Sequence, residues 1–420
     1  MDSLLLPNEI ELYVDTMCIQ KIENLGSYQW IEWHHRLQKL NQEALIEALE
    51  IKEEHVKETL VCFGKVPLLV HEAILISIWK QKVLPELLKL EPYPENTFIA
   101  YSVLYHEAVC VALLELVLFH PNCCETLGDV AADLLEYSTA NVSQLLTITQ
   151  TEPDLSETTA KQLIRQKHDL SFEIGIRSLA IIRYLSESLD TLPVSVKSKM
   201  YADYDVPVLF TEIIIRAPWY KDGKVYVGGK WKKWDNEQLS QYEGQAWLTI
   251  RQLLLDPECS KYYALTDKHR TMLSKLLPRM IPTLLDQLSP LIELQEWLSR
   301  FNLMEENHSD PKPLLIETVL DIKESILNQT GRKWKSIAQK QVHQIFTNDK
   351  ETLQAIAGRL SNAYNTELLE MFEAQGEEKC ARCENNASKR CSRCHNVWYC
   401  SRECQVEHWN IHKERCQSTS

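Results

Sequence analysis

The carboxy-terminal segment concentrates cysteine and histidine at the spacings of zinc ligands. Seven of the thirteen cysteines lie between residues 380 and 416, and with one histidine they form four pairs: Cys380-x2-Cys383, Cys391-x2-Cys394, Cys400-x3-Cys404 and His412-x3-Cys416. Structural zinc takes four such donors in a tetrahedron, so eight donors predict two Zn2+ ions. The x2 pairs suit tight turns, and the x3 pairs suit a helix, where residues i and i+4 share a face. Full coordination leaves no position for a catalytic water, which favours a structural role.

A ninth candidate donor, His408, means that the spacing alone does not decide which residues form the second x3 pair. Cys400, Cys404, His408, His412 and Cys416 recur at every fourth residue. By spacing alone, His408-x3-His412 is as good a pair as His412-x3-Cys416. We favour the pair that contains Cys416, because a thiolate binds Zn2+ well.

Charge divides the chain into two unlike parts. Residues 380–420 carry seven basic and four acidic side chains, a net charge of +3, so the remainder carries -17 of the total of -14. An acidic chain of this kind argues against binding of nucleic acid or anionic membranes, which need clustered Lys and Arg. The other six cysteines are scattered over a long body, which indicates a reducing compartment rather than a disulfide framework. The amino terminus lacks the basic n-region of a signal peptide, so we expect a cytoplasmic protein.

Apolar residues recur with helical periodicity through most of the body. Glycine is scarce, at 11 of 420 residues, as expected for helices with few tight turns. The predicted helical segments are 32–62, 67–83, 97–120, 129–149, 155–189, 235–255, 267–277, 290–303, 313–329, 332–346 and 350–373. Short joins between them suggest an all-α scaffold of antiparallel helices stacked in sequence, as in armadillo or HEAT solenoids, without a repeat of fixed length. We therefore predict a helical domain over 1–375 and a zinc finger over 376–420.

Two stretches of the body could suggest other roles. Residues 97–120 are long and apolar enough to resemble a membrane span, but they contain His106, Glu107 and Glu115. Charged groups are costly in lipid, so we predict a buried core helix and no membrane span. Residues 217–234 carry Asp222-Gly223 between alternating aromatic and β-branched residues, which predicts one small β-hairpin. Its five lysines and three tryptophans indicate either a recognition surface for an acidic or aromatic partner, or an insertion whose tryptophans pack on neighbouring helices.

The sequence shows no constellation typical of an enzyme. It lacks the glycine-rich phosphate and dinucleotide motifs and the G-x-S-x-G nucleophile motif. A methyltransferase is one alternative, because Asn307-His308-Ser309 resembles a fragment of the SET cofactor site, but these residues lie in a polar linker. A nuclear transcriptional co-regulator that recruits corepressors is another, although no long Lys/Arg run supports nuclear import. We expect a non-enzymatic protein.

The tail, CARCENNASKRCSRCHNVWYCSRECQVEHWNIHKERC, resembles a MYND zinc finger at every ligand spacing. The resemblance implies an interleaved arrangement in which the first and third pairs hold one ion and the second and fourth pairs hold the other. It places His408 at a position that does not usually bind metal. It also implies a protein-interaction module, with Ser392, Gln405 and Trp409 at the positions that contact a peptide.

Segments of the body extend the resemblance to nearly the whole chain. They are GKVPLLV at 64–70, WKQKV at 79–83, NTF at 96–98, YHEA at 105–108, TLLDQL at 283–288 and GRKWKSIA at 331–338. Together with a carboxy-terminal MYND finger, they resemble the MYND-domain proteins that help to assemble axonemal dynein arms. That family implies a co-chaperone-like scaffold for motile cilia. Its expected partners are other dynein arm assembly factors, chaperones and dynein subunits. Its expected location is the cytoplasm, including centriolar satellites and the ciliary base.

Overall fold

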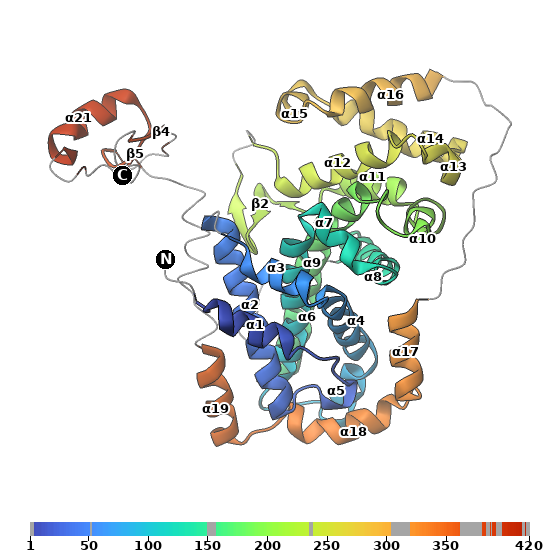
Figure 1. The fold of residues 1–420 in the computed structure, drawn as a ribbon, viewed down its shortest axis with the longest axis vertical. Coiled ribbons are helices and arrows are strands. Elements are labelled where there is room, and N and C mark those ends of the chain that lie inside the picture. The colour runs from blue at the N-terminus through green and yellow to red at the C-terminus, as the bar shows by residue number, and fades with distance from the viewer. Residues whose placement is uncertain are drawn as a thin grey trace. The chain divides into compact units, whose positions relative to one another are not determined.

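The chain forms two compact units, residues 1–359 and residues 360–420. The computed structural model describes residues 4–50, 53–148, 157–234, 238–303, 320–361, 380–383, 387, 389–391, 397–413 and 416. The predicted domain boundary at 375/376 therefore lies outside the described residues. The first unit is a helical body and the second contains the cysteine-rich finger, so the all-α prediction for the body is confirmed (Figure 1).

The described part of the body is built from α-helices joined mostly by short turns. In its first half the helices are α1 (Pro7–Asp15), α2 (Tyr28–Glu50), α3 (His55–Cys62), α4 (Val66–Lys82), α5 (Leu84–Leu90), α6 (Phe98–Leu118), α7 (Pro121–Cys124), α8 (Val130–Leu145) and α9 (Thr159–Glu187). In its second half they are α10 (Val194–Ser198), α11 (Val206–Arg216), α12 (Gln241–Leu254), α13 (Cys259–Tyr262), α14 (Asp267–Leu273), α15 (Pro282–Gln287), α16 (Leu291–Leu303), α17 (Asp321–Thr330), α18 (Trp334–Ile345) and α19 (Lys350–Ser361). Short 3-10 or π turns lie at η1 (Ile22–Asn24), η2 (Glu125–Leu127), η3 (Lys199–Asp203) and η4 (Ser274–Arg279).

Helix α6 is the centre of the body. It packs against α2, α4 and α9, while α9 also packs against α8 and α12. Apolar residues lie around most of the circumference of α6, which is typical of a helix in the core of a protein. It is long and apolar enough to cross a membrane, but 78% of its most apolar window is buried inside the body. The sequence expectation of a buried core helix is met by this packing.

The charged groups on α6 are buried with partners. Glu107 accepts hydrogen bonds from Lys80 Nζ at 2.6 Å and from Tyr137 Oη at 2.9 Å. The Nδ1 atoms of His106 and His34 lie 2.8 Å apart, so the N–H of one ring donates a hydrogen bond to the nitrogen of the other. Burial and the neighbouring His106 lower the pKa of His34, which keeps that ring neutral. Pairing of this kind removes much of the cost of enclosing polar groups, so these histidines belong to the core.

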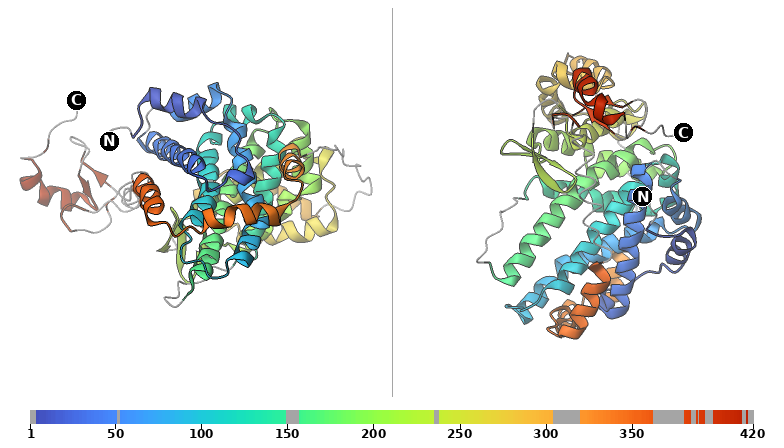
Figure 2. Two further views of the ribbon diagram at one scale, coloured as in Figure 1. Left: turned by 90° about the horizontal axis from the view of Figure 1, so that it is seen from below. Right: turned by 90° about the vertical axis from the view of Figure 1, so that its left-hand side faces the viewer.

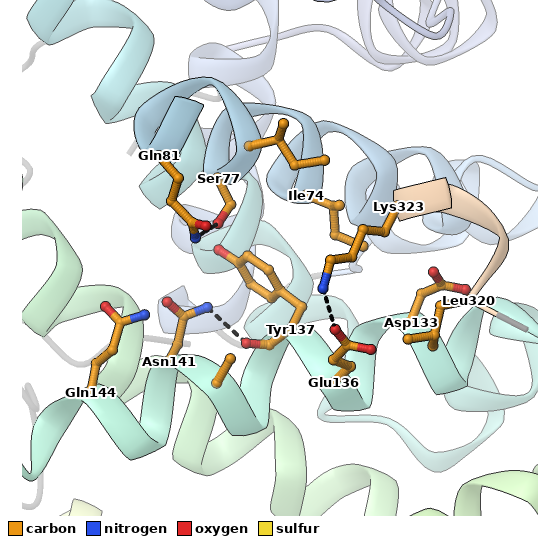
Figure 3. A pocket seen from close by; sticks show the side chains of 12 residues that line it. Ile74, Ser77, Gln81, Asp133, Glu136, Tyr137, Asn141, Gln144, Leu320 and Lys323 are labelled. Carbon is orange, nitrogen blue, oxygen red and sulfur yellow. Dashed lines mark hydrogen bonds and ion pairs between the residues drawn. The ribbon is translucent and has the colours of Figure 1, made fainter. Parts of the chain in front are cut away.

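The carboxy-terminal helices return to the amino-terminal half of the body. Helix α17 packs against α4 and α8, and α18 packs against α5, α6 and η1. Figure 3 shows the first contact, where Lys323 forms an ion pair with Glu136 at 2.7 Å beside a cleft of about 100 Å³. The Asp133 carboxylate on α8 accepts a hydrogen bond from the Ile322 amide in the first turn of α17. The carboxy-terminal helices therefore depart from a strictly sequential stacking of antiparallel helices.

The predicted hairpin is a three-stranded antiparallel sheet. Strands β1 (Tyr220–Lys221), β2 (Lys224–Val227) and β3 (Lys230–Lys233) pair in that order beside α12 (Figure 2). The first turn places Asp222 and Gly223 at φ 50° and 72°, as a type I′ turn requires. The second turn, at Gly228-Gly229, was not predicted as a separate reversal of the chain. Tyr226 packs edge-on against Phe172 of α9 at 5.0 Å, so the sheet is anchored to the body by its aromatic residues.

Candidate metal centre

The described ligand residues of the finger lie next to two small strands and within or just after one helix. Strand β4 (Lys389–Arg390) pairs with β5 (Trp398–Tyr399), and α21 (Arg402–His412) follows at once. The Ala381 amide donates to the Trp398 carbonyl at 3.0 Å, and the Cys391 amide donates to the Val397 carbonyl at 2.8 Å. These backbone bonds hold the first two ligand turns against the β5 strand. The hydroxyl of Ser401 accepts from the Cys404 amide at 3.3 Å, which caps the start of α21.

The first cluster joins the first and third ligand pairs. The sulfurs of Cys380, Cys383, Cys400 and Cys404 all lie within 4.8 Å of one another. The Cys383–Cys400, Cys400–Cys404 and Cys404–Cys383 Sγ distances are 3.4, 3.5 and 3.8 Å. Zinc–sulfur bonds of about 2.3 Å in a tetrahedron separate the sulfurs by about 3.8 Å, whereas a disulfide brings them to about 2.05 Å. The four thiols therefore have the spacing of a zinc site.

The pKa values of these thiols are consistent with a zinc site. Burial opposes ionisation of Cys380, but backbone amides that hydrogen-bond to it lower its pKa to about 6, so it is a thiolate at neutral pH. Hydrogen bonding to the sulfurs of Cys383 and Cys404 raises the pKa of Cys400 to about 12. Four sulfurs this close cannot all carry negative charge unless a cation lies between them. Zn2+ supplies that charge, so the donor set fits the ion.

The second cluster joins the second and fourth ligand pairs. The ligand atoms of Cys391, His412 and Cys416 lie within 4.8 Å of one another, with Cys391 Sγ 3.4 Å from His412 Nε2 and 3.9 Å from Cys416 Sγ. All three residues are buried. Cys394, the fourth predicted donor, lies outside the described residues. The two clusters together show the interleaved arrangement, and the finger can bind two zinc ions.

The structure places His408 away from both clusters. Its Nδ1 atom lies 3.0 Å from the Tyr399 hydroxyl. Tyr399 is completely buried and forms the apolar centre of the finger together with Cys380, Cys391 and Cys416. By sequence spacing alone, either His408 or Cys416 could pair with His412 as a zinc ligand. In the structure Cys416 lies beside Cys391, whereas His408 contacts Tyr399. Sequence reasoning did not identify Tyr399 as a residue that positions the site, because a lone aromatic residue between two ligand pairs carries no specific signal.

The expected peptide-contacting residues on α21 share one side of the helix. Gln405 and Trp409 are one helical turn apart, and both are partly exposed. Trp409 is 37% exposed and the neighbouring Val406 is 64% exposed, so an apolar surface faces solvent here. Ser392 lies outside the described residues. A large indole held at the surface by a helix that carries zinc-ligand residues is suited to contact another polypeptide.

Comparisons with known proteins agree with this geometry. Residues 380–416 match the family model of the MYND finger. Over 446 aligned residues the chain is 35% identical to the zinc finger MYND domain-containing protein 10 homolog of Drosophila melanogaster, an alignment that covers 98% of this chain and 99% of that relative. No solved structure matches the chain. Because the similarity extends over the helical body as well as the finger, the chain belongs to the zinc finger MYND domain-containing protein 10 family.

Proposed function

We propose that this chain is a non-enzymatic, co-chaperone-like scaffold that helps to preassemble and stabilise axonemal dynein arms. Its MYND finger is a protein-interaction module. The observation that carries the proposal is the partly exposed side of α21 that contains Gln405 and Trp409. The described ligand cysteines of the finger are gathered in two clusters of candidate zinc ligands. A site of this kind can hold a peptide but offers no open metal position for a reaction. The full-length family relationship supports the same role for the helical body.

The proposed partners are other dynein arm assembly factors, chaperones and dynein subunits, and the proposed place of action is the cytoplasm, including centriolar satellites and the ciliary base. The acidic body supports protein rather than nucleic-acid partners, since it would repel phosphate backbones. In this proposal the finger captures one protein and the body contacts another.

The experiment that tests the proposal is affinity purification of the full chain from ciliated cells. Trp409→Ala should lose partner capture while two zinc ions per chain are retained, because Trp409 lies outside both clusters. Glu403→Ala, on another side of the same helix, is the matched control and should capture partners normally. A version that ends at Gln375 should lose the same partners. Normal capture by Trp409→Ala would place the contacts elsewhere, and steady nuclear enrichment or robust methyl transfer by the purified chain would contradict the scaffold reading.

A further inference from the structure

A second candidate binding site lies on the helical body, between the α4–α5 junction and the start of α18. It is an open pocket of about 600 Å³. One side is formed by Gln81, Lys82, Pro85 and Glu86, and the other by residues 332–336, which lie some 250 positions later in the chain. The return of α17 and α18 to the amino-terminal half creates this pocket, so no sequence motif could show it.

The pocket is strongly basic on an acidic body. Lys82, Arg332, Lys333 and Lys335 all line it, and all four are exposed. Among the described residues, none of these four side chains takes part in an ion pair. The single acidic residue of the lining, Glu86, forms an ion pair with Lys89 at 2.6 Å, and the more distant Lys335 also lowers its pKa, so one carboxylate faces several cations. Four cationic side chains therefore line one pocket of a helical body whose net charge is strongly negative.

The backbone brings these cations together through an unusual turn. Gly331 and Arg332 both have left-handed backbone conformations, with φ of 55° and 56°. Such a conformation is unfavourable for a residue with a Cβ atom and is held here by surrounding contacts. The Gly331 and Lys333 amides donate to the Asn328 and Thr330 carbonyls, which fixes the turn between α17 and α18. Arg332 and the lysines that follow are thus held at the mouth of the pocket despite their mutual repulsion.

The remaining lining is suited to a polypeptide. Trp334 is half-buried beside the cations, and Pro85 also lines the pocket. These apolar surfaces can cover the carbon stems of acidic side chains whose carboxylates reach the cations. A long polyanion such as nucleic acid would also be repelled by the net negative charge of the rest of the body, to which a short segment is less exposed.

We propose that this pocket binds a short acidic segment of a partner polypeptide. The binding is independent of the MYND finger, so it supplies the scaffold with a second point of attachment. The complex forms by pairing of carboxylates with the Lys82, Lys333 and Lys335 ammonium groups and the Arg332 guanidinium, and it should weaken as salt concentration rises.

The test uses the zinc-loaded full chain and a fluorescein-labelled peptide that contains six consecutive glutamates, with a six-glutamine peptide as the neutral probe. Fluorescence anisotropy should show binding of the glutamate peptide alone. The Lys333→Glu/Lys335→Glu variant should raise its Kd about tenfold or more, since each reversal replaces an attraction with a repulsion. A glutamate at the start of α18 favours helix formation, so this variant should fold.

The matched control is Lys224→Glu/Lys233→Glu in the three-stranded sheet. These two residues are directly opposite each other on β2 and β3, so the control changes net charge equally and keeps a like-charged pair. It should shift the Kd by less than about twofold. The neutral variant Lys333→Gln/Lys335→Gln should give an intermediate loss. Equal losses in the reversal and control variants, no binding by the unmodified chain, or equally tight binding of a six-nucleotide single-stranded DNA would each overturn the proposal.

Discussion

The hydrogen bond between Tyr399 and His408 decides which histidine of α21 is available to metal. Both His408 and His412 are spaced for a ligand pair, and their rings stack 6.0 Å apart. Only His412 reaches the sulfur of Cys391. His408 instead lies against the buried hydroxyl of Tyr399, where its role is to position the core of the finger.

Replacement of each histidine should separate these roles. His408→Ala should retain two zinc ions per chain and cost the finger about 1 kcal/mol, the net value of one hydrogen bond. His412→Ala removes a ligand and should leave one ion per chain at limiting zinc. Metal content of the purified full-length variants, measured by atomic spectroscopy, checks both results. A lost ion in His408→Ala with two ions in His412→Ala would reverse the assignment.

Helix α17 is held to α8 by a buried carboxylate at its first turn. Asp133 is 5% exposed and accepts from the Ile322 amide at 3.2 Å. Burial raises the pKa of Asp133 to about 6, although the Ile322 amide acts in the opposite direction. The folded state therefore binds this proton more tightly than the unfolded chain does. The resulting stabilisation is present at about pH 4 and is lost as pH rises through about 6.

Asp133→Asn should remove this pH dependence while the amide oxygen still accepts from Ile322. We expect the free energy of unfolding of the variant, relative to the unmodified chain, to rise by about 1 kcal/mol between pH 4.5 and pH 7.5. Urea denaturation followed by circular dichroism at several pH values gives this difference. A difference that stays constant with pH, or one that falls, would contradict the buried-carboxylate explanation.

At the scale of the whole molecule, Gln341 links distant parts of the body. Its side chain on α18 accepts from Trp79 Nε1 at 3.0 Å and donates to the Ile22 carbonyl at 2.7 Å. Gln341, Trp79 and Ile22 are all buried, so no solvent can replace these hydrogen bonds. One amide therefore connects α18 to α4, 262 residues earlier in the chain, and to η1, 319 residues earlier.

Gln341→Ala should destabilise the body by about 2–3 kcal/mol, because it leaves a buried indole N–H and a buried carbonyl without partners. Gln339→Ala lies on the same helix at an exposed position and should change stability by less than about 0.5 kcal/mol. Guanidinium denaturation of the two variants gives the comparison. Similar midpoints for both would show that the amide does not hold the carboxy-terminal helices in place.

Predictions from the sequence agree best with the structure where the sequence signal extends over only a few neighbouring residues. Helices α4, α6 and α8 were predicted close to their observed bounds, because apolar periodicity and flanking prolines are local properties of the chain. Helix α11 was not predicted, since its valines and isoleucines are equally typical of a strand and its packing against α12 selects the helix. The predicted segment 32–62 is divided between α2 and α3.

The sequence by itself determined that the body is helical and that the tail carries two sets of zinc donors, because helix periodicity and ligand spacing act over a few residues. Only the tertiary structure decided which histidine faces Cys391, that His34 meets His106, and that Arg332 and its neighbours face Lys82. Each of these depends on contacts between residues far apart in the chain. Such contacts are set by how the helices pack, and no short-range pattern encodes them.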